Sequence, residues 1–418
     1  MIKNEKTKSL PITKRMVMEA YLQVKANRGI GGVDGESLKT FEEDLPKKLY
    51  KIWNRLSSGS YFPPAVLEVK IPKSNGSLRS LGIPTISDRI AQQVIKSYLD
   101  PRLEKIFHEQ SYGYRPNRSA HQALSVARSN AQRYEWLIDL DISNFFGELS
   151  HELLMKALEV HVEEKWVKMY IQRWLAAPKQ LENGTLILPN GKGTPQGGVI
   201  SPLLANLYLH YSLDKWLDLH YKVPFERYAD DVVIHCISES MAHQLLAAIR
   251  SRLRDCGLRL NAEKTQIVCC RKNRRKGNQG KYPITFDFLG YRFQPMRSKD
   301  KYGRVFLGYD CAISPKSIQR ITQKWKRMKI HRWVKATIEL IASELNPILR
   351  GIIHYYGKFR RKQLSIVFKR LHYRIVKWLL RKYKRLGKSV NKAYKMLRRI
   401  RRQQPDLFYH WKLKYSVM

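Results

Sequence analysis

The sequence lacks the features that mark secreted, membrane-spanning and zinc-binding proteins. Its five cysteines form no C-x-x-C pair, which argues against a disulfide framework and a cysteine-based zinc site. No stretch approaches the roughly 18 consecutive apolar residues of a membrane span. The first segment, MIKNEKTKSLPITKR, holds no apolar core of a signal peptide. We therefore expect a cytoplasmic protein with reduced thiols and no membrane contact, in the bacterial cytosol or associated with the nucleoid.

Acidic residues are scarce relative to basic ones. The 418 residues include 35 Asp and Glu against 78 Lys and Arg, a formal net charge of +43. A folded chain with this charge repels itself unless a polyanion neutralises it, so we expect a nucleic-acid partner. Membrane binding is the alternative, but no lipidation motif supports it. Residues 311–418 carry 30 basic and three acidic side chains, so +27 of the charge lies there.

Hydrophobic periodicity predicts an α+β domain followed by a helical one. Helices are expected over these segments: 13–28, a second stretch ending near 56, 88–106, 119–133, 202–217 and 241–256. Strands are expected over 66–71 and 136–142 and on both sides of a turn within 227–232, while Asn75-Gly76 is typical of a two-residue hairpin turn. This order fits helices packed on one face of an antiparallel sheet. After about residue 312 only helical patterns remain.

Two pairs of aspartates stand beside strand-forming residues. Asp230 and Asp231 are adjacent at an expected hairpin tip, where the alternative is that Asp simply favours turns. Asp139 and Asp141 lie on one face of another strand. Two carboxylates about 4 Å apart repel by roughly 4 kcal/mol at an effective dielectric constant of 20. A cation such as Mg²⁺, which prefers oxygen ligands, offsets that repulsion, so the pattern indicates two-metal phosphoryl or nucleotidyl transfer.

Eight motifs in a fixed order resemble the reverse transcriptase/maturase proteins encoded by group II introns. They are IPKSNGSLRSLGIPTISDR (71–89), SYGYRPNRSAHQA (111–123), DLDISNFFGELSH (139–151), GTPQGGVISPLLANLYL (193–209), RYADD (227–231), LNAEKT (260–265), FLGYRF (288–293) and LNPILRGIIHYYGKF (345–359). The resemblance covers nearly the whole chain. It implies a right-hand polymerase with fingers and palm, followed by an all-α thumb/maturase domain.

The resemblance also implies catalytic roles. Asp141, Asp230 and Asp231 match the ligands of two Mg²⁺ ions, for which Mn²⁺ can substitute, and Asp139 is the competing carboxylate on the same strand face. Lys73 and Arg79 match fingers residues that bind the triphosphate; the alternative is a solvated hairpin tip.

Further residues match the nucleotide pocket. One of Phe145 and Phe146, with Phe146 preferred, is expected to reject a 2′-hydroxyl, although either ring can instead belong to the core. Gln196 matches the loop near the templating base pair, and Lys264 matches a residue that positions or protonates pyrophosphate.

Nucleic-acid contacts are expected at the hairpin and in the C-terminal third. The candidates are Tyr228, Ala229, Arg350, Tyr355, Tyr356, Lys358, Arg360, Arg361, Arg398, Arg399, Arg401 and Arg402. Basic side chains there are expected to contact phosphates, and aromatic ones to stack on RNA bases or else to pack between helices.

Some positions depart from the family pattern. Gly147 stands where an acid usually follows the Phe pair, and Ile352 and His354 replace the usual Trp and Asn. No His-Asn-His nuclease cassette with paired cysteines is found. His354, His372 and His410 are expected to be isolated surface or packing residues.

We therefore expect a reverse transcriptase domain over 1–305, a thumb/maturase domain over 306–385 and a basic tail over 386–418. The expected function is RNA-directed DNA synthesis coupled to splicing and retrohoming of the encoding intron. The expected partners are group II intron RNA, an RNA template with a DNA primer, target DNA and dNTPs, and a homodimer is considered. The alternatives are a co-opted host reverse transcriptase or an RNA-binding splicing cofactor with a decayed polymerase site.

Overall fold

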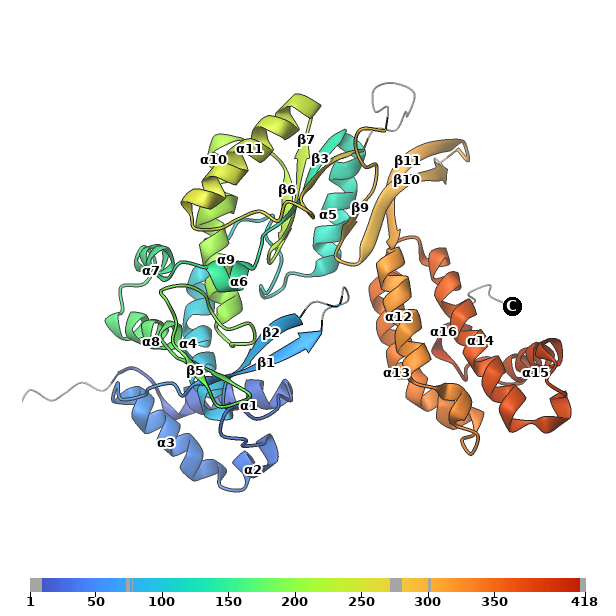
Figure 1. Cartoon of the computed structure of the whole chain (residues 1–418), viewed down its shortest axis with the longest axis horizontal. Helices are drawn as coiled ribbons and strands as arrows, with labels where there is room; N and C mark the ends of the chain where they lie inside the picture. The colour runs from blue at the N-terminus through green and yellow to red at the C-terminus, as the bar shows by residue number, and fades with distance from the viewer. Residues whose placement is uncertain (1–9, 73–75, 77, 271–279, 300–301, 414–418) are drawn as a thin grey trace, which may run out of the picture. The chain divides into compact units, whose positions relative to one another are not determined.

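The computed structural model describes residues 10–72, 76, 78–270, 280–299 and 302–413 (Figure 1). The chain divides into two compact units. Unit 1 comprises Met1–Ser119, Leu140–Ile234 and Ser240–Gln266, and unit 2 comprises Ala120–Asp139, His235–Glu239 and Ile267–Met418. Among the helices in the described part of the chain, none is both long and apolar enough to cross a bilayer.

Unit 1 begins with helices α1 (Lys14–Ala26), α2 (Leu38–Glu42) and α3 (Leu45–Ser57). Thr13 caps α1 through its side-chain oxygen, which accepts the N–H of Met16. The second predicted helical stretch divides into α2 and α3 because Pro46 stands in the first turn of α3, where its missing N–H has no cost. Helix α4 (Ile86–Leu103) packs against α1.

A four-stranded sheet in unit 1 has the order β2-β1-β4-β5. It consists of β1 (Val66–Pro72), β2 (Leu78–Ile83), β4 (Lys179–Leu181) and β5 (Leu186–Ile187). The β1–β2 hairpin is antiparallel, as predicted, but β1 pairs with β4 in parallel, so the expectation of a purely antiparallel arrangement is wrong here. The long connection between β1 and β4 allows such a crossover. Asn75 lies outside the described residues.

The sheet that carries the candidate aspartates has the order β6-β7-β3-β8. Its strands are β3 (Trp136–Asp141), β6 (Phe225–Tyr228), β7 (Asp231–Cys236) and β8 (Gln266–Cys269). The predicted strand alternation is confirmed in β3, where Leu140 is buried and Asp141 is partly exposed. In the sequence, α5 (Ala120–Arg133) directly precedes β3, and α11 (Glu239–Asp255) directly follows β7. Helix α11 ends before Gly257, which has φ +70°.

The helical segment that precedes β6 is interrupted. It consists of α9 (Ser201–Leu209), a π-helix η1 (His210–Asp214) and α10 (Lys215–His220), whereas the sequence predicts one continuous helix. Shorter helices α6 (Phe145–Glu148), α7 (His151–Glu159) and α8 (Lys165–Leu175) follow β3, and the hydroxyl of Ser150 caps α7.

In unit 2, an antiparallel sheet of order β11-β10-β9 leads into helices. The strands are β9 (Phe286–Phe288), β10 (Tyr291–Lys299) and β11 (Val305–Ile313). The helices are α12 (Pro315–Arg327), η2 (Ile330–Arg332), α13 (Ile338–Tyr356), η3 (Arg361–Leu364), α14 (Ser365–Lys382), η4 (Lys384–Leu386), α15 (Val390–Gln403) and α16 (Tyr409–Lys412). Between Ile313 and residue 413, the last that the structure describes, all elements are helices, as predicted, and β11 runs across the domain boundary predicted at residue 305.

Candidate active site

The candidate metal ligands Asp230 and Asp231 lie at the hairpin turn between β6 and β7. Tyr228 pairs with Asp231, which leaves Ala229 and Asp230 as the two central residues of the turn. Ala229 has φ +58°, in the left-handed region that side chains usually avoid. A Cβ atom on Gly113 would lie 2.4 Å from the Ala229 nitrogen. Only glycine therefore allows residue 113 to approach the turn this closely.

Asp141 ends β3, and the segment of the LNAEKT motif holds its main chain. The Asp141 carbonyl accepts the N–H of Asn261 at 2.8 Å. The main-chain N–H of Asp141 donates to the Thr265 hydroxyl at 3.3 Å. The same segment supplies Lys264, whose Nζ donates to Oδ2 of Asp141 at 2.9 Å. Two residues that sequence patterns predict for different roles are therefore in direct contact.

Electrostatics link the three aspartates. Desolvation by the surrounding chain is the largest cause that raises the pKa of Asp231, to about 6, although part of this residue is exposed; the charges of Asp230 and Asp141 add to the shift. The pKa of Asp230 is also raised, first by burial and then by the charge of Asp141. Among the described residues, no three His, Cys, Asp or Glu side chains converge as a ready-made metal site. The three carboxylates nevertheless have the charge and the oxygen ligands that a divalent cation requires, and in this structure Asp141 bonds to Lys264 instead.

Basic and aromatic side chains surround this cluster. Arg79, on β2 opposite Ile71, is exposed, and its charge lowers the pKa values of Asp230 and Asp231 against the causes that raise them. Lys73 lies outside the described residues. Sequence patterns did not single out Tyr114, which is 58% exposed; partial desolvation by the surrounding chain and the neighbouring charge of Asp230 raise the pKa of its hydroxyl. Its ring centroid lies 6.5 Å from that of Tyr228, and its place in the motif at residues 111–123 was the available sequence signal.

The two phenylalanines of α6 occupy different environments. Phe145 is only 2% exposed and packs against Tyr208, which favours the alternative that this ring belongs to the core. Phe146 is half-buried, and its carbonyl accepts the N–H of Thr194 at 2.7 Å. Of the pair, Phe146 is the ring with surface available to a ligand.

The loop of Gln196 packs against the β1–β2 hairpin. The Gln196 carbonyl accepts the N–H of Gly82 on β2 at 2.7 Å, and a Cβ atom on Gly197 would lie 2.3 Å from the Gly82 oxygen. A cavity of about 310 Å³ borders this contact, with Leu81 and Arg89 among its lining residues. The Gln196 side chain is half-buried.

Gly147 departs from the family pattern for a local reason. A Cβ atom there would lie 2.3 Å from Nδ2 of Asn144, whose backbone is left-handed (φ 44°). The Asn144 side chain therefore fills the space that a side chain at residue 147 would occupy.

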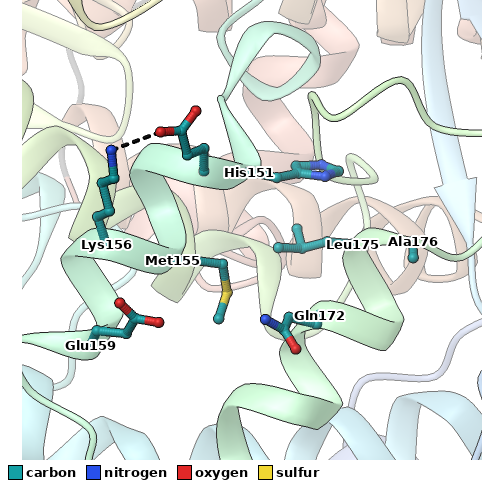
Figure 2. A pocket seen from close by; sticks show the side chains of 8 residues that line it. His151, Met155, Lys156, Glu159, Gln172, Leu175 and Ala176 are labelled. Carbon is teal, nitrogen blue, oxygen red and sulfur yellow. Dashed lines mark hydrogen bonds and ion pairs between the residues drawn. The ribbon is translucent and has the colours of Figure 1, made fainter.

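A separate cavity of about 450 Å³ lies between helices α7 and α8 (Figure 2). None of the candidate site residues lines it.

Several nucleic-acid candidates in unit 2 have structural partners. Tyr356 is 6% exposed and bonds to Ser317, which favours the alternative that this ring packs between helices. Tyr355 is half-buried and donates its hydroxyl hydrogen to the Leu289 carbonyl at 2.7 Å. Arg360 donates to the buried carboxylate of Asp310 at 2.5 Å, so its guanidinium is engaged within the protein.

Other basic candidates reach solvent. Arg350, Lys358, Arg361, Arg398, Arg399 and Arg402 are exposed. The last three lie on α15, whose opposite face buries Ala393 and Leu397. Arg401 is half-buried, and its charge lowers the pKa values of His372 and His410, after burial.

The expectation that the C-terminal histidines are isolated is wrong for two of them. His372 on α14 and His410 on α16 are each 1% exposed, with their Nε2 atoms 2.7 Å apart. Trp411 donates its indole N–H to Nε2 of His372 at 3.0 Å. The predicted packing role is confirmed for these two rings, while His354 is exposed.

Comparisons with known protein families agree with this geometry. A family model described as "Reverse transcriptase (RNA-dependent DNA polymerase)" matches residues 71–293. A second, described as "Group II intron, maturase-specific domain", matches residues 318–402. The first range includes all three candidate aspartates, and the second includes the exposed arginines of α15.

Several curated proteins are similar to this chain in sequence. Protein YkfC of Escherichia coli strain K12 is 33% identical over 315 residues, which cover 66% of this chain and 78% of that protein. The group II intron-encoded protein LtrA of Lactococcus lactis is 34% identical over 211 residues, 50% of this chain and 34% of LtrA. The putative COX1/OXI3 intron 1 protein of Saccharomyces cerevisiae is 24% identical over 451 aligned positions, 94% of this chain and 50% of that protein. The chain thus spans about a third of LtrA and half of the yeast protein.

Proposed function

Because this chain belongs to the reverse transcriptase (RNA-dependent DNA polymerase) family, we propose that Asp141, Asp230 and Asp231 are its polymerase metal ligands. The observation that carries the proposal is that Asp230 and Asp231 lie at the β6–β7 turn while Asp141 ends β3, the strand next to β7, and, after burial, the charge of Asp141 raises the pKa values of both. Reverse transcriptase domains generally use divalent metal ions; Mg²⁺ is the proposed ion, and Mn²⁺ a substitute. The substrates are dNTPs and a DNA primer annealed to an RNA template.

The bound cation supplies the positive charge that stabilises the attacking primer oxygen and the leaving pyrophosphate. The protein contributes the surrounding charges. Lys264 neutralises Asp141 in the free protein, and its ammonium group would be available to a phosphate oxygen once Asp141 holds the metal. Arg79 adds a second cation for the triphosphate. Phe146 presents the ring that excludes a 2′-hydroxyl.

The basic surface of unit 2 supports a second role in RNA binding. We propose that the chain binds the group II intron RNA that encodes it, promotes its splicing and takes part in its retrohoming into target DNA. The supporting observations are the maturase-specific match and the exposed arginines of α15, which suit phosphate contacts. Self-association as a homodimer stays a prediction, which the molar mass measured by light scattering tests.

Two alternatives are distinguishable. A splicing cofactor with a decayed polymerase site is not expected to carry acids at all three ligand positions, yet Asp141, Asp230 and Asp231 are all present. A co-opted host enzyme differs in gene context, because only an intron-encoded gene lies inside a ribozyme with a recognisable domain V.

Primer extension tests the polymerase proposal. The purified chain is expected to extend a DNA primer on an RNA template with Mg²⁺ and to stop when the metal is chelated. Asp230→Asn removes a ligand charge at nearly constant volume, so activity is expected to fall by several orders of magnitude. Asp255→Asn, an exposed acid in the same unit, is the matched control. Full activity of Asp230→Asn contradicts the assignment.

A further inference from the structure

A fully buried ion pair lies behind the catalytic turn and takes no part in the chemistry described above. Arg227 on β6 and Asp214 at the end of η1 both have side chains with 0% exposure. The guanidinium grips the carboxylate at two points, Nε to Oδ1 at 2.7 Å and Nη2 to Oδ2 at 2.5 Å. Removing two charges from water costs several kcal/mol per ion, and well-packed apolar residues often stabilise a fold as well or better. Stability alone therefore does not explain this pair.

The remaining guanidinium nitrogen reaches the turn itself. Nη1 of Arg227 donates to the Ala229 carbonyl at 3.1 Å and to Oδ1 of Asn206 at 2.9 Å. Ala229 is the residue with the left-handed backbone next to Asp230. A non-glycine residue in that region costs of order 1–3 kcal/mol and persists only where its surroundings hold it. Arg227 supplies a direct bond of that kind.

Asn206 holds the turn from a second side. Its Nδ2 donates to the Gly113 carbonyl at 2.8 Å, and Gly113 is the residue packed against the Ala229 nitrogen. The chain on either side of Arg227 is fixed as well, because its N–H and carbonyl bond to Gln110 and Tyr112, respectively. One amide and one guanidinium thus join three separate segments around the Ala229 turn.

The π-helix explains how Asn206 and Asp214 both reach Arg227. At 3.6 residues per turn, side chains eight positions apart on a continuous α-helix point about 80° away from each other. A π-turn adds one residue to a helical turn. After that insertion, residues 206 and 214 differ by about 20° and share one face. The interruption at His210–Asp214 therefore places two side chains on Arg227 that a regular helix separates.

We propose that Arg227, Asp214 and Asn206 form a positioning network that sets the geometry of the Asp230–Asp231 turn for metal binding. The proposal rests on the proposed assignment of these aspartates as metal ligands. None of the three network residues is proposed to touch substrate, so each is a positioning residue. Disruption of the network is expected to displace the ligands rather than remove them, which raises the Mg²⁺ concentration needed for activity.

Arg227→Lys is the main test. It keeps the positive charge but loses the fork that spans Asp214, Asn206 and Ala229. We expect kcat for RNA-templated extension to fall about 10- to 100-fold at a fixed Mg²⁺ concentration, as ångström-scale misplacement does elsewhere. The Mg²⁺ concentration that gives half of the maximal extension rate is expected to increase. The KM for dNTP is expected to change less than kcat. A purely structural role lowers the melting temperature without moving the Mg²⁺ requirement of the folded fraction.

Two further variants keep the test decisive. Arg173→Lys is the matched control, because Arg173 in the same unit also donates to two main-chain carbonyls, those of Gly59 and Tyr61, away from the turn. Its Mg²⁺ requirement is expected to stay at the wild-type value. Asn206→Ser removes one arm of the network and leaves the ion pair intact, so it serves if Arg227→Lys does not fold. It is expected to shift the Mg²⁺ requirement in the same direction.

Asp230→Asn, measured in parallel, separates the two proposals. An inactive Asp230→Asn with wild-type kinetics and Mg²⁺ dependence in folded Arg227→Lys and Asn206→Ser overturns the network alone. A fully active Asp230→Asn overturns the metal-ligand assignment on which the network depends.

Discussion

Lys264 Nζ lies 2.9 Å from Oδ2 of Asp141, so a lysine and a candidate metal ligand share one ion pair. The lysine side chain is 62% exposed and the aspartate side chain 25% exposed, which means that solvent screens the pair and its stability contribution is small. We expect the Lys264 ammonium group to leave Asp141 and bind a phosphate oxygen when metal and nucleotide bind.

Lys264→Met tests this exchange. The variant is expected to fold normally and to extend primers more slowly, because the phosphate loses one positive partner. The largest effect is expected in pyrophosphorolysis, measured as primer shortening with added pyrophosphate. Lys156→Met is the control, since Lys156 forms a comparable exposed pair with Glu152 outside the site. Equal rates in the wild type and Lys264→Met contradict the exchange.

Sugar selection is expected to depend on Phe146 alone. In Phe146→Val the smaller side chain leaves room for a 2′-hydroxyl, so the ratio of rNTP to dNTP incorporation rises. Phe145→Ala is instead expected to destabilise the fold by about 3–5 kcal/mol, the usual cost of deleting a buried ring. Competition assays and denaturant unfolding measure the two effects. An unchanged ratio in Phe146→Val assigns that ring to packing.

The buried pair of His372 and His410 predicts a pH dependence of stability. Burial, followed by the charge of Arg401, lowers the pKa of His372 to about 3, and burial, then His372 and Arg401, lower that of His410. The unfolded chain takes up protons near pH 6.5 that the folded chain excludes. The free energy of unfolding is therefore highest above about pH 6.5, where both histidines are neutral in the folded and unfolded states. It decreases as the pH falls toward 3, by up to about 1.4 kcal/mol per pH unit for each histidine.

Denaturant unfolding at several pH values between 7.5 and 5, monitored with a probe in unit 2, measures how the free energy of unfolding changes with pH. A double variant with His372→Asn and His410→Gln is expected to show a smaller slope even though its stability at pH 7.5 is lower. His354→Gln, a change at an exposed histidine, leaves the slope unchanged. A slope that persists in the double variant means that other groups carry it.

RNA affinity is expected to depend on the exposed arginines of α15. Changing Arg398, Arg399 and Arg402 to Gln removes three candidate phosphate-binding side chains and leaves Arg401 beside the histidine pair. The slope of log affinity against log salt is expected to decrease by about 0.7–0.9 for each phosphate that the protein no longer neutralises. A variant with Lys222, Arg250 and Arg254 changed to Gln removes equal charge from unit 1. Filter binding to intron RNA compares them, and equal slopes in the two variants contradict a specific role for α15.

Local patterns predicted the hairpin at residues 227–232 and the strand of Asp141, because strand alternation and turn chemistry are properties of neighbouring residues. They did not predict the π-turn at residues 210–214. Leu209, Leu213 and Leu217 keep an unbroken four-residue spacing that is typical of one α-helix. The interruption instead lets Asn206 and Asp214 both contact Arg227, a residue of a later strand.

Pairings between distant residues were beyond the sequence patterns. His372 and His410 are 38 residues apart, and β1 pairs with β4 across more than a hundred residues. The burial of Tyr356 likewise depends on Ser317 of another helix. Side-chain exposure set by tertiary packing therefore separates Phe146 from Phe145 and Arg398 from Arg401, whereas residue type alone makes each pair equivalent.

Single-turnover incorporation of one dNTP on an RNA template, measured across Mg²⁺ concentrations, tests the central claim most directly. The two variants to compare are Asp141→Asn and Asp139→Asn. Each lacks one carboxylate of β3 relative to the wild type, so the two variants are matched. Asp141→Asn is expected to lose several orders of magnitude in rate at every Mg²⁺ concentration, and Asp139→Asn to stay near the wild-type rate. Equal losses in the two variants, or a wild-type rate in Asp141→Asn, contradict the assignment of Asp141 as the third metal ligand.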